Sequence, residues 1–291
     1  MKVFLKYISI LLGFILITMV VLDIVYTTVY NTGAYRNKLM WVRDMDNITL
    51  DYVLLGSSRV NYSIKPNLIE VKTGKKGYNL GMNATNIVET IALFEEFLKY
   101  NTTKVVYVQV DVQYINEMPD PIGEVAWIPY IHEEAVYKYF SQYSNSYTYY
   151  RYVPFYRYQK FAGRLGFREV VSSATGSGYE YPDSMGYMPL KGMLQQDEEF
   201  VPESTITEEN KLYTKFIQLC KKNDISVYFF TSPYYRLRDD LKELHLVLPN
   251  YTNFADSLQQ QSYFSDPVHL NNEGAEHFTE IFIETYFSEA H

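Results

Sequence analysis

The sequence predicts an α/β fold built around a central parallel sheet. Short apolar segments rich in β-branched residues alternate with amphipathic, helix-like segments along most of the chain, which is typical of β-α-β units. A pair of serines directly follows the first strand-like segment, where parallel sheets usually bind ligands. With 291 residues, of which 47% are hydrophobic and 21% charged, the chain can bury one sizeable core with additions.

The N-terminal segment is predicted to be a membrane anchor. An apolar run extends from Tyr7 to Val29 with Asp23 as its only charge, and as a helix it can cross about 30 Å of hydrocarbon. No small-x-small cleavage site follows it, so a retained anchor is favoured over a cleaved signal peptide. Lys2 and Lys6 precede the run, which predicts a single-pass protein of the cell membrane with a cytoplasmic N-terminus and an extracytoplasmic C-terminal part. Asp23 is expected near the outer interface, where it can reach water.

A polar connector at about residues 31–47 leads into the predicted α/β domain. Its first strand, Leu50–Leu55, ends at Gly56 and delivers Ser57 and Ser58 to the carboxyl end of the sheet. The later elements are expected, in order, as helix Lys65–Thr73, strand Gly77–Leu80, helix Asn86–Tyr100, strand Lys104–Val110, helix Glu208–Asn223, strand Ile225–Phe230, helix Arg236–Leu244, strand Tyr251–Phe254 and helix Asn272–Tyr286.

The regular alternation stops at about residues 112–207, which are interpreted as an insertion. This stretch is rich in Tyr, Pro and Gly and carries much of the 17% aromatic content. Such a segment can line a sugar-binding groove through aromatic faces, or it can form a satellite core of its own. The predicted organisation is therefore an anchor at residues 1–30, a connector at 31–47, and one extracytoplasmic domain at 48–291 that contains the insertion.

Composition excludes several classes of function. The net charge of −8 and the lack of a basic stripe argue against a nucleic-acid partner. Cys220 is the single cysteine, and no histidine spacing typical of zinc sites occurs. We therefore predict no metal ion and no cofactor.

Three residues predict nucleophilic chemistry. Serine is a weak nucleophile unless an imidazole takes its proton, and a carboxylate is needed to orient that imidazole. Ser58 follows the first strand, and Asp266 and His269 stand three residues apart just before the last helix. The alternatives are that Ser58 only caps a helix and that His269 is structural.

These motifs resemble the SGNH (GDSL-like) hydrolase superfamily. Gly56-Ser57-Ser58 stands in place of its Gly-Asp-Ser block, and Asp266-Pro267-Val268-His269, followed by Leu270-Asn271-Asn272-Glu273-Gly274, is similar to its Asp-x-x-His block. The resemblance covers about Leu50–Asp111 and Ile225–Phe287. It implies a flavodoxin-like three-layer sandwich with Ser58, Asp266 and His269 as the catalytic triad.

The same resemblance implies the surroundings of the nucleophile. The oxyanion donors would be Ser58, Ala84 at the position of the second-block glycine, and Gln113 in place of the third-block asparagine, which this sequence lacks. Arg59 and Asn79 are expected to contact substrate. An ion pair or a solvated position is the alternative for Arg59.

Together with the anchor and Asn79-Leu80-Gly81-Met82, the pattern is similar to membrane-anchored SGNH-like proteins encoded beside membrane-bound O-acyltransferases in bacterial surface-polysaccharide systems. This implies a serine O-acyltransferase or esterase that acts on acetyl or other acyl groups of a surface glycan through a Ser58 acyl-enzyme, with a membrane-bound O-acyltransferase as a possible partner. The alternative is a catalytically silent, anchored accessory protein that binds glycan or such a partner.

Overall fold

The computed structural model describes the whole chain except residues 196–198, 202–208, 239–240 and 289–291. Two compact units are present. The anchor unit consists of residues 1–40 and 124–179, and the sheet unit consists of residues 41–123 and 180–291. Each unit is described separately.

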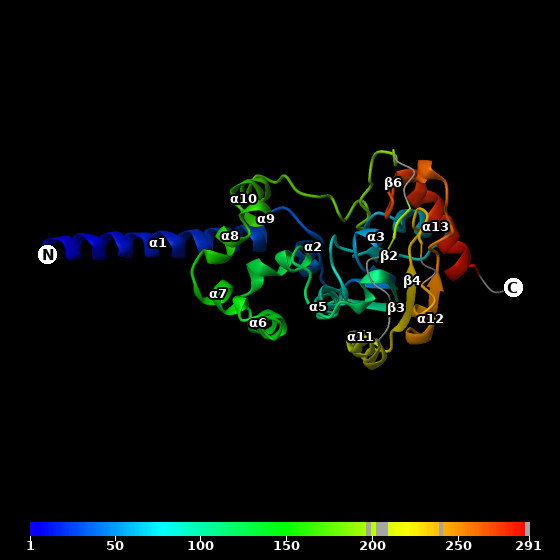
Figure 1. The fold of residues 1–291 in the computed structure, drawn as a ribbon, viewed down its shortest axis with the longest axis horizontal. Helices are drawn as coiled ribbons and strands as arrows, with labels where there is room; N and C mark the ends of the chain where they lie inside the picture. Colours follow the sequence, from blue (N-terminus) through cyan, green and yellow to red (C-terminus); the bar gives the residue numbers. More distant parts are fainter. Residues whose placement is uncertain (196–198, 202–208, 239–240, 289–291) are drawn as a thin grey trace. The chain divides into compact units, whose positions relative to one another are not determined.

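A parallel sheet organises the sheet unit (Figure 1). Within the described residues it has five strands in the order β2-β1-β3-β4-β5, and every neighbouring pair is parallel. This 2-1-3-4-5 order is that of doubly wound, flavodoxin-like proteins, so the predicted fold class is confirmed. The strands are β1 (Thr49–Leu55), β2 (Gly77–Asn79), β3 (Thr102–Gln109), β4 (Ser226–Thr231) and β5 (Tyr251–Asn253).

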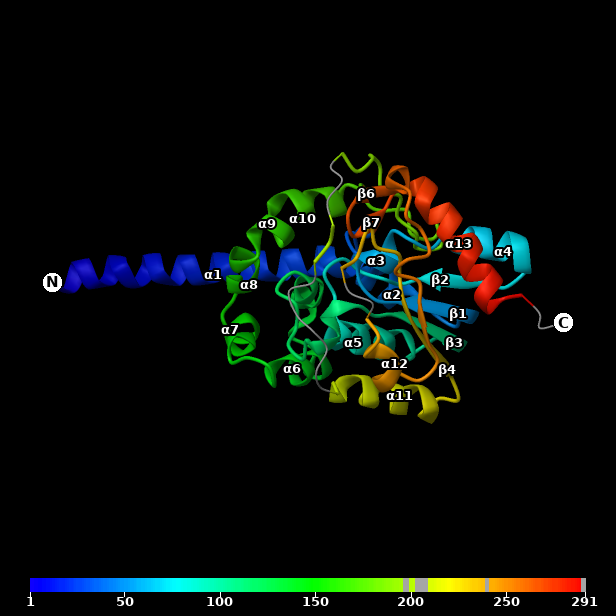
Figure 2. The same cartoon turned by 45° about the vertical axis from the view of Figure 1, so that its right-hand side comes forward.

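Helices cover both faces of this sheet, which makes three layers (Figure 2). Because side chains alternate along a strand, Tyr52 and Leu54 face one side, where they share a core with Phe278 and Phe282 of α13 (Asn272–Tyr286). Helix α4 (Pro66–Thr73) packs beside α13 on that side. Helices α5 (Ile87–Phe97) and α11 (Lys211–Lys222) contact one another on the opposite side.

The remaining elements of the sheet unit are short. They are α3 (Ser58–Asn61), η1 (Val112–Ile115), α12 (Leu244–Val247), η3 (Gln261–Tyr263), and an antiparallel pair formed by β6 (Phe264–Asp266) and β7 (His269–Leu270).

The helix predicted at Arg236–Leu244 is wrong for the part that the structure describes. Leu237 instead forms an isolated bridge with Phe200, and a short helix begins only at Leu244. Arg236 and Leu241 have φ angles of 48° and 51°, a left-handed backbone that a right-handed helix cannot contain. The apolar spacing there reflects residues that are buried without a continuous helix, namely Leu241 in the loop and Leu244 at the start of α12.

Helix α1 (Lys2–Thr32) dominates the anchor unit and is long and apolar enough to cross a membrane. The rest of the unit consists of η2 (Gly123–Tyr130), α6 (Glu134–Ser141), α7 (Ser146–Tyr152), α8 (Tyr156–Lys160), α9 (Ala162–Leu165) and α10 (Phe167–Ala174). Helix α2 (Lys38–Asp44) joins the two units along the chain and buries Leu39 and Trp41, although its segment was expected to be a polar connector.

The predicted insertion has more regular structure than its sequence indicates. Its residues 134–174 are largely helical, and its aromatic side chains build a satellite core that includes the buried Phe140, Tyr147, Tyr150 and Tyr158. The described part of this segment is divided between the units, because residues 124–179 belong to the anchor unit and the rest to the sheet unit. Residues 196–198 and 202–207 of the insertion lie outside the described residues.

Candidate active site

The end of β1 places the two serines in different roles. Gly56 has a φ angle of 135°, and a Cβ there would lie 2.9 Å from Cβ of Gln109, so glycine is required at this turn. Ser57 is the N-cap of α3, and its hydroxyl accepts a hydrogen bond from the backbone N–H of Arg59 at 3.2 Å. Ser58 therefore does not serve as the cap, and its hydroxyl is available for another partner.

That partner is His269. The Ser58 Oγ lies 2.7 Å from Nε2 of His269, although the residues are 211 positions apart in the sequence. The other ring nitrogen, Nδ1, lies 2.8 Å from Oδ2 of Asp266. Both contacts are within hydrogen-bond range, so the three residues form a continuous relay from carboxylate to imidazole to hydroxyl.

The turn between β6 and β7 holds the carboxylate in place. The Oδ1 atom of Asp266 accepts the backbone N–H groups of Val268 at 2.9 Å and of His269 at 3.0 Å. Burial raises the pKa of Asp266, but the hydrogen bond and charge of His269 and these two N–H groups together hold that pKa below its usual value. Asp266 therefore remains ionised at neutral pH and can stabilise a protonated imidazole.

The loop after β2 lies against the nucleophile segment. Thr85 Oγ1 and the Met82 N–H both donate to the carbonyl of Gly56 at 2.9 Å. Between them, Ala84 has a φ angle of 52°, a left-handed conformation that favours glycine. Alanine thus adopts a backbone conformation that is usual for glycine, and the hydrogen bonds to Gly56 keep the loop next to Ser58.

Gln113 lies in η1 as an exposed residue, and its backbone N–H donates to Oδ1 of Asp111 at 2.9 Å. Its expected role as an oxyanion donor remains a prediction.

Arg59 has a structural environment. Its guanidinium is buried, donates to the carbonyls of Ser232 and, at 2.8 Å, Pro233, and lies 3.7 Å from the carboxylate of Asp111 and 3.2 Å from the ring centre of Tyr234. Burial lowers the pKa of Arg59 to about 10, against the opposing charge of Asp111, so the group is cationic at neutral pH. These contacts fasten the loop after β4 to α3 and give no support to a contact with substrate.

Asn79 likewise makes its hydrogen bonds to the protein backbone. It is fully buried, donates to the carbonyls of Val60 at 2.7 Å and Ile64 at 3.0 Å, and accepts the N–H of Gly81 at 3.1 Å. Both amide hydrogens are used, so Asn79 positions the segment after the nucleophile rather than facing a ligand.

A buried network that the sequence did not reveal supports Ser57. Oε1 of Gln109 accepts the Ser57 N–H at 3.2 Å and the Ser57 hydroxyl at 2.7 Å. Nε2 of Gln109 donates to Oδ2 of Asp111 at 2.8 Å. The available signal was a glutamine near the end of an otherwise apolar strand, where a buried polar group needs partners.

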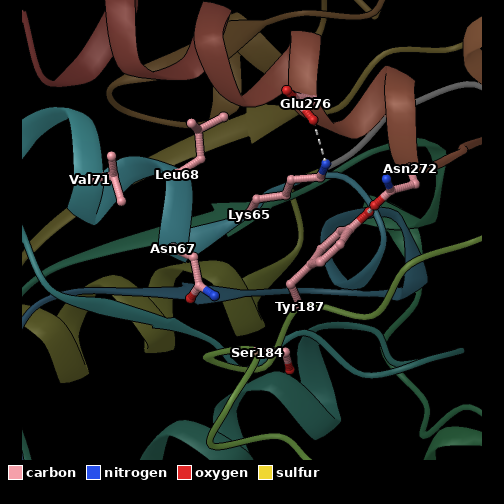
Figure 3. A pocket seen from close by; sticks show the side chains of 8 residues that line it. All are labelled: Lys65, Asn67, Leu68, Val71, Ser184, Tyr187, Asn272 and Glu276. Carbon is pink, nitrogen blue, oxygen red and sulfur yellow. Dashed lines mark hydrogen bonds and ion pairs between the residues drawn. The ribbon is translucent and has the colours of Figure 1, made fainter.

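A cavity of about 380 Å³ lies between α4, α13 and the loop at residues 184–187 (Figure 3). Tyr187 crosses it, with its hydroxyl donating to Oδ1 of Asn272 at 3.1 Å, and Lys65 pairs with Glu276 at 3.0 Å on its rim. Burial raises the pKa of Tyr187, so its phenol stays protonated. The other lining residues are Asn67, Leu68, Val71 and Ser184.

Among the residues that the structure describes, no group of three or more His, Cys, Asp or Glu side chains is arranged to hold a metal ion.

Comparison with known proteins does not assign this chain to a family. No protein-family model matches the sequence, and no curated protein matches it. A solved structure provisionally described as a platelet activating factor from Streptococcus pneumonia aligns over 97% of this chain and 98% of its own, with 10% identity and a TM-score of 0.40. The fold is therefore assigned from the strand order, and the site from the interatomic distances given above.

Proposed function

We propose that this chain is a membrane-anchored serine esterase or O-acyltransferase of the SGNH type, acting on acyl groups, most simply acetyl groups, of a cell-surface polysaccharide. The observation that carries the proposal is the relay in which Ser58 Oγ lies 2.7 Å from His269 Nε2 and His269 Nδ1 lies 2.8 Å from Asp266. A serine that only caps a helix does not require this arrangement.

In the proposed first step, Ser58 Oγ attacks the carbonyl carbon of the ester and His269 Nε2 takes its proton. Asp266 keeps the imidazole in the tautomer that accepts at Nε2, and it stabilises the imidazolium that forms. The tetrahedral oxyanion is stabilised by the backbone N–H groups of Ser58 and Ala84, with Gln113 as a further donor. Collapse breaks the ester bond, and the leaving alkoxide takes the proton from His269.

In the second step, His269 takes a proton from the acceptor while the oxygen of the acceptor attacks the carbonyl carbon of the acyl group on Ser58. Collapse then breaks the bond between that carbon and Ser58 Oγ, which takes the proton back from His269. Water as acceptor gives hydrolysis, and a sugar hydroxyl gives transfer. The two outcomes use the same protein groups and differ in whether the site excludes water while a glycan is bound.

The cavity beside α13 supports a carbohydrate substrate. It combines the ring of Tyr187 with the amides of Asn67 and Asn272, and its size falls in the range of small-molecule sites. The cavity is linked along the chain to the site, because Asn272 follows His269 by three residues. A membrane-bound O-acyltransferase remains our proposed partner for acyl supply, and the anchor would hold the C-terminal part outside the cytoplasm. A C-terminal alkaline phosphatase fusion that is inactive on intact cells would contradict that orientation.

The chemistry is tested by mass spectrometry of the intact chain incubated with p-nitrophenyl acetate. We expect one acetyl adduct, located on Ser58, that is absent from Ser58→Ala. Ser57→Ala is the matched control: it loses a helix cap, worth about 1 kcal/mol, and should still be acetylated. An adduct on Ser57, or an adduct that persists in Ser58→Ala, contradicts the assignment.

One observation favours the second candidate, a catalytically silent accessory protein. The strand that should lead to the third oxyanion donor ends in Gln109, whose amide is bound to Ser57 and Asp111. If neither p-nitrophenyl acetate nor a fluorophosphonate labels the folded chain above the Ser58→Ala background, the accessory function replaces the enzyme.

A further inference from the structure

Helix α1 has two parts with different surroundings. Residues 3–22, a length of about 30 Å as a helix, contain no buried side chain, whereas Asp23, Tyr26 and Tyr30 are buried by the rest of the anchor unit. The unaccompanied part thus has the thickness of a hydrocarbon layer. The protein begins to surround the helix at Asp23.

The segment that surrounds the helix there is the start of α8. The Asp23 carboxylate lies 2.9 Å from the guanidinium of the fully buried Arg157 and accepts the backbone N–H of Phe155 at 2.7 Å. One turn further along, the hydroxyls of Thr27 and Tyr158 lie 2.8 Å apart. These contacts fix residues 155–158 alongside α1 immediately after its unaccompanied part.

Exposed aromatic and apolar side chains flank this contact. Tyr149 and Tyr152 of α7 are 60% and 65% exposed, and Val153 and Tyr156 are each 38% exposed. In both ribbon views, α7 and α8 lie at the end of the anchor unit that is nearest the N-terminal part of α1 (Figures 1 and 2). Soluble proteins seldom expose large aromatic and apolar side chains next to one another. The membrane–water interface favours tyrosine because its ring is apolar and its hydroxyl is polar.

We propose that this aromatic surface, formed by Tyr149, Tyr152, Val153 and Tyr156, is embedded in the headgroup region of the bilayer that α1 crosses. We assign lipid as the partner of this surface because the surface lies level with the end of the part of α1 that crosses the bilayer. The uncharged part of α1, residues 7–22, ends at this level, where Asp23 begins the contact with the rest of the anchor unit. The inference rests on the proposed membrane anchor and is independent of the proposed chemistry.

Nearby charge fits the same partner. Lys160 and Arg164 are exposed and follow the aromatic surface along α8 and α9, whereas Arg168 pairs at 2.8 Å with Glu169, which also binds Arg36 past the end of α1. Basic side chains at this level are attracted to anionic headgroups. Two contacts, an aromatic surface and a helix, would restrict the tilt of the anchor unit on the membrane, which a single helix cannot do.

The test is depth-dependent fluorescence quenching of the full chain in vesicles of phosphatidylcholine and phosphatidylglycerol that carry a spin label at acyl carbon 5 or 12. The probe is Tyr152→Trp. The signal of Trp41 and Trp127, which are both buried, is subtracted using the unmodified chain. Tyr179→Trp is the matched control in the same unit, because Tyr179 is 43% exposed and its N–H bonds the carbonyl of Tyr35, beyond the far end of α1.

Ile10→Trp, in the middle of the unaccompanied part of α1, reports insertion of the helix. We expect strong quenching of that indole by the label at carbon 12. For Tyr152→Trp we expect quenching by the label at carbon 5 at least twofold greater than for Tyr179→Trp, and greater than by the label at carbon 12. Insertion at position 10 with equal quenching at positions 152 and 179 overturns the aromatic surface alone. If the indole at position 10 is not quenched, both the membrane anchor and the membrane contact of the aromatic surface are contradicted. Neither result bears on acetylation of Ser58.

Discussion

Two carboxylates in this protein make contacts of nearly equal length in opposite settings. In the sheet unit, Asp266 lies 2.8 Å from His269, and their side chains are 46% and 21% exposed. In the anchor unit, Asp23 lies 2.9 Å from Arg157, and their side chains are 10% and 0% exposed. Distance alone does not distinguish the two pairs.

The difference lies in what each pair can exchange. An imidazole can take up and release a proton during a reaction, and His269 presents its second nitrogen to Ser58, so the contact with Asp266 can serve a reaction. A guanidinium does not exchange protons in such a reaction, and Arg157 faces only protein, so its contact with Asp23 can serve only the fold. Changes to the first pair should therefore reduce turnover, and changes to the second should reduce stability.

The largest expected effect comes from replacing Ser58 or His269, the proposed nucleophile and base. Ser58→Ala and His269→Ala should each reduce hydrolysis of p-nitrophenyl acetate by roughly 10⁴-fold or more, because neither nucleophile nor base works without the other. The double variant should be little worse than either single variant. Full activity of His269→Ala, or strictly additive losses, would contradict the relay.

Asp266→Asn should follow with a loss of roughly 10³- to 10⁴-fold in kcat. The amide keeps the shape of the carboxylate but allows the wrong imidazole tautomer and no longer balances the imidazolium charge. The unfolding midpoint should change little, since Asp266 is nearly half exposed. If the variant instead is less stable but keeps its kcat per folded molecule, Asp266 has a structural role, like Asp23, and not a catalytic one.

For the buried pair we expect the reverse outcome. Asp23→Ala leaves the Arg157 guanidinium buried without its counter-charge, which should destabilise the anchor unit by about 3–5 kcal/mol in thermal unfolding of the full chain in detergent. Acetylation of Ser58 should be unchanged per folded molecule. The variant that combines Asp23→Leu with Arg157→Met should recover much of the lost stability, because no unpaired charge remains.

The smallest effect concerns acid stability. Because the folded state holds the pKa of Asp266 below its unfolded value, the contribution of this group is present above about pH 4 and is lost as pH falls through the lowered folded pKa. The unfolding free energy of the wild type should thus fall more steeply as the pH drops below about 4 than that of Asp266→Asn. Parallel curves would show that the relay does not favour the ionised carboxylate.

Local signals in the sequence were enough for the sheet and for the last helix. Apolar runs between turns predicted β1, β3 and β4 to within two residues. Helix α13 begins and ends where expected because Asn271 caps it by accepting the N–H groups of Glu273 and Gly274, a contact formed within four residues. The strand order 2-1-3-4-5 comes from the structure, because the rules for β-α-β units permit more than one order.

The α/β class, the apolar N-terminal helix and the candidates Ser58, Asp266 and His269 could be predicted from the sequence, because each prediction depends on residues that are neighbours in the chain. Only the tertiary structure brought Ser58 and His269 within 2.7 Å, committed Asn79 to the fold, and gave Asp23 its partner 134 residues away. The physical reason is that burial and hydrogen-bond partners of a polar side chain are set by segments remote in the sequence. The same residue type can therefore be catalytic, structural or solvated until the packing around it is known.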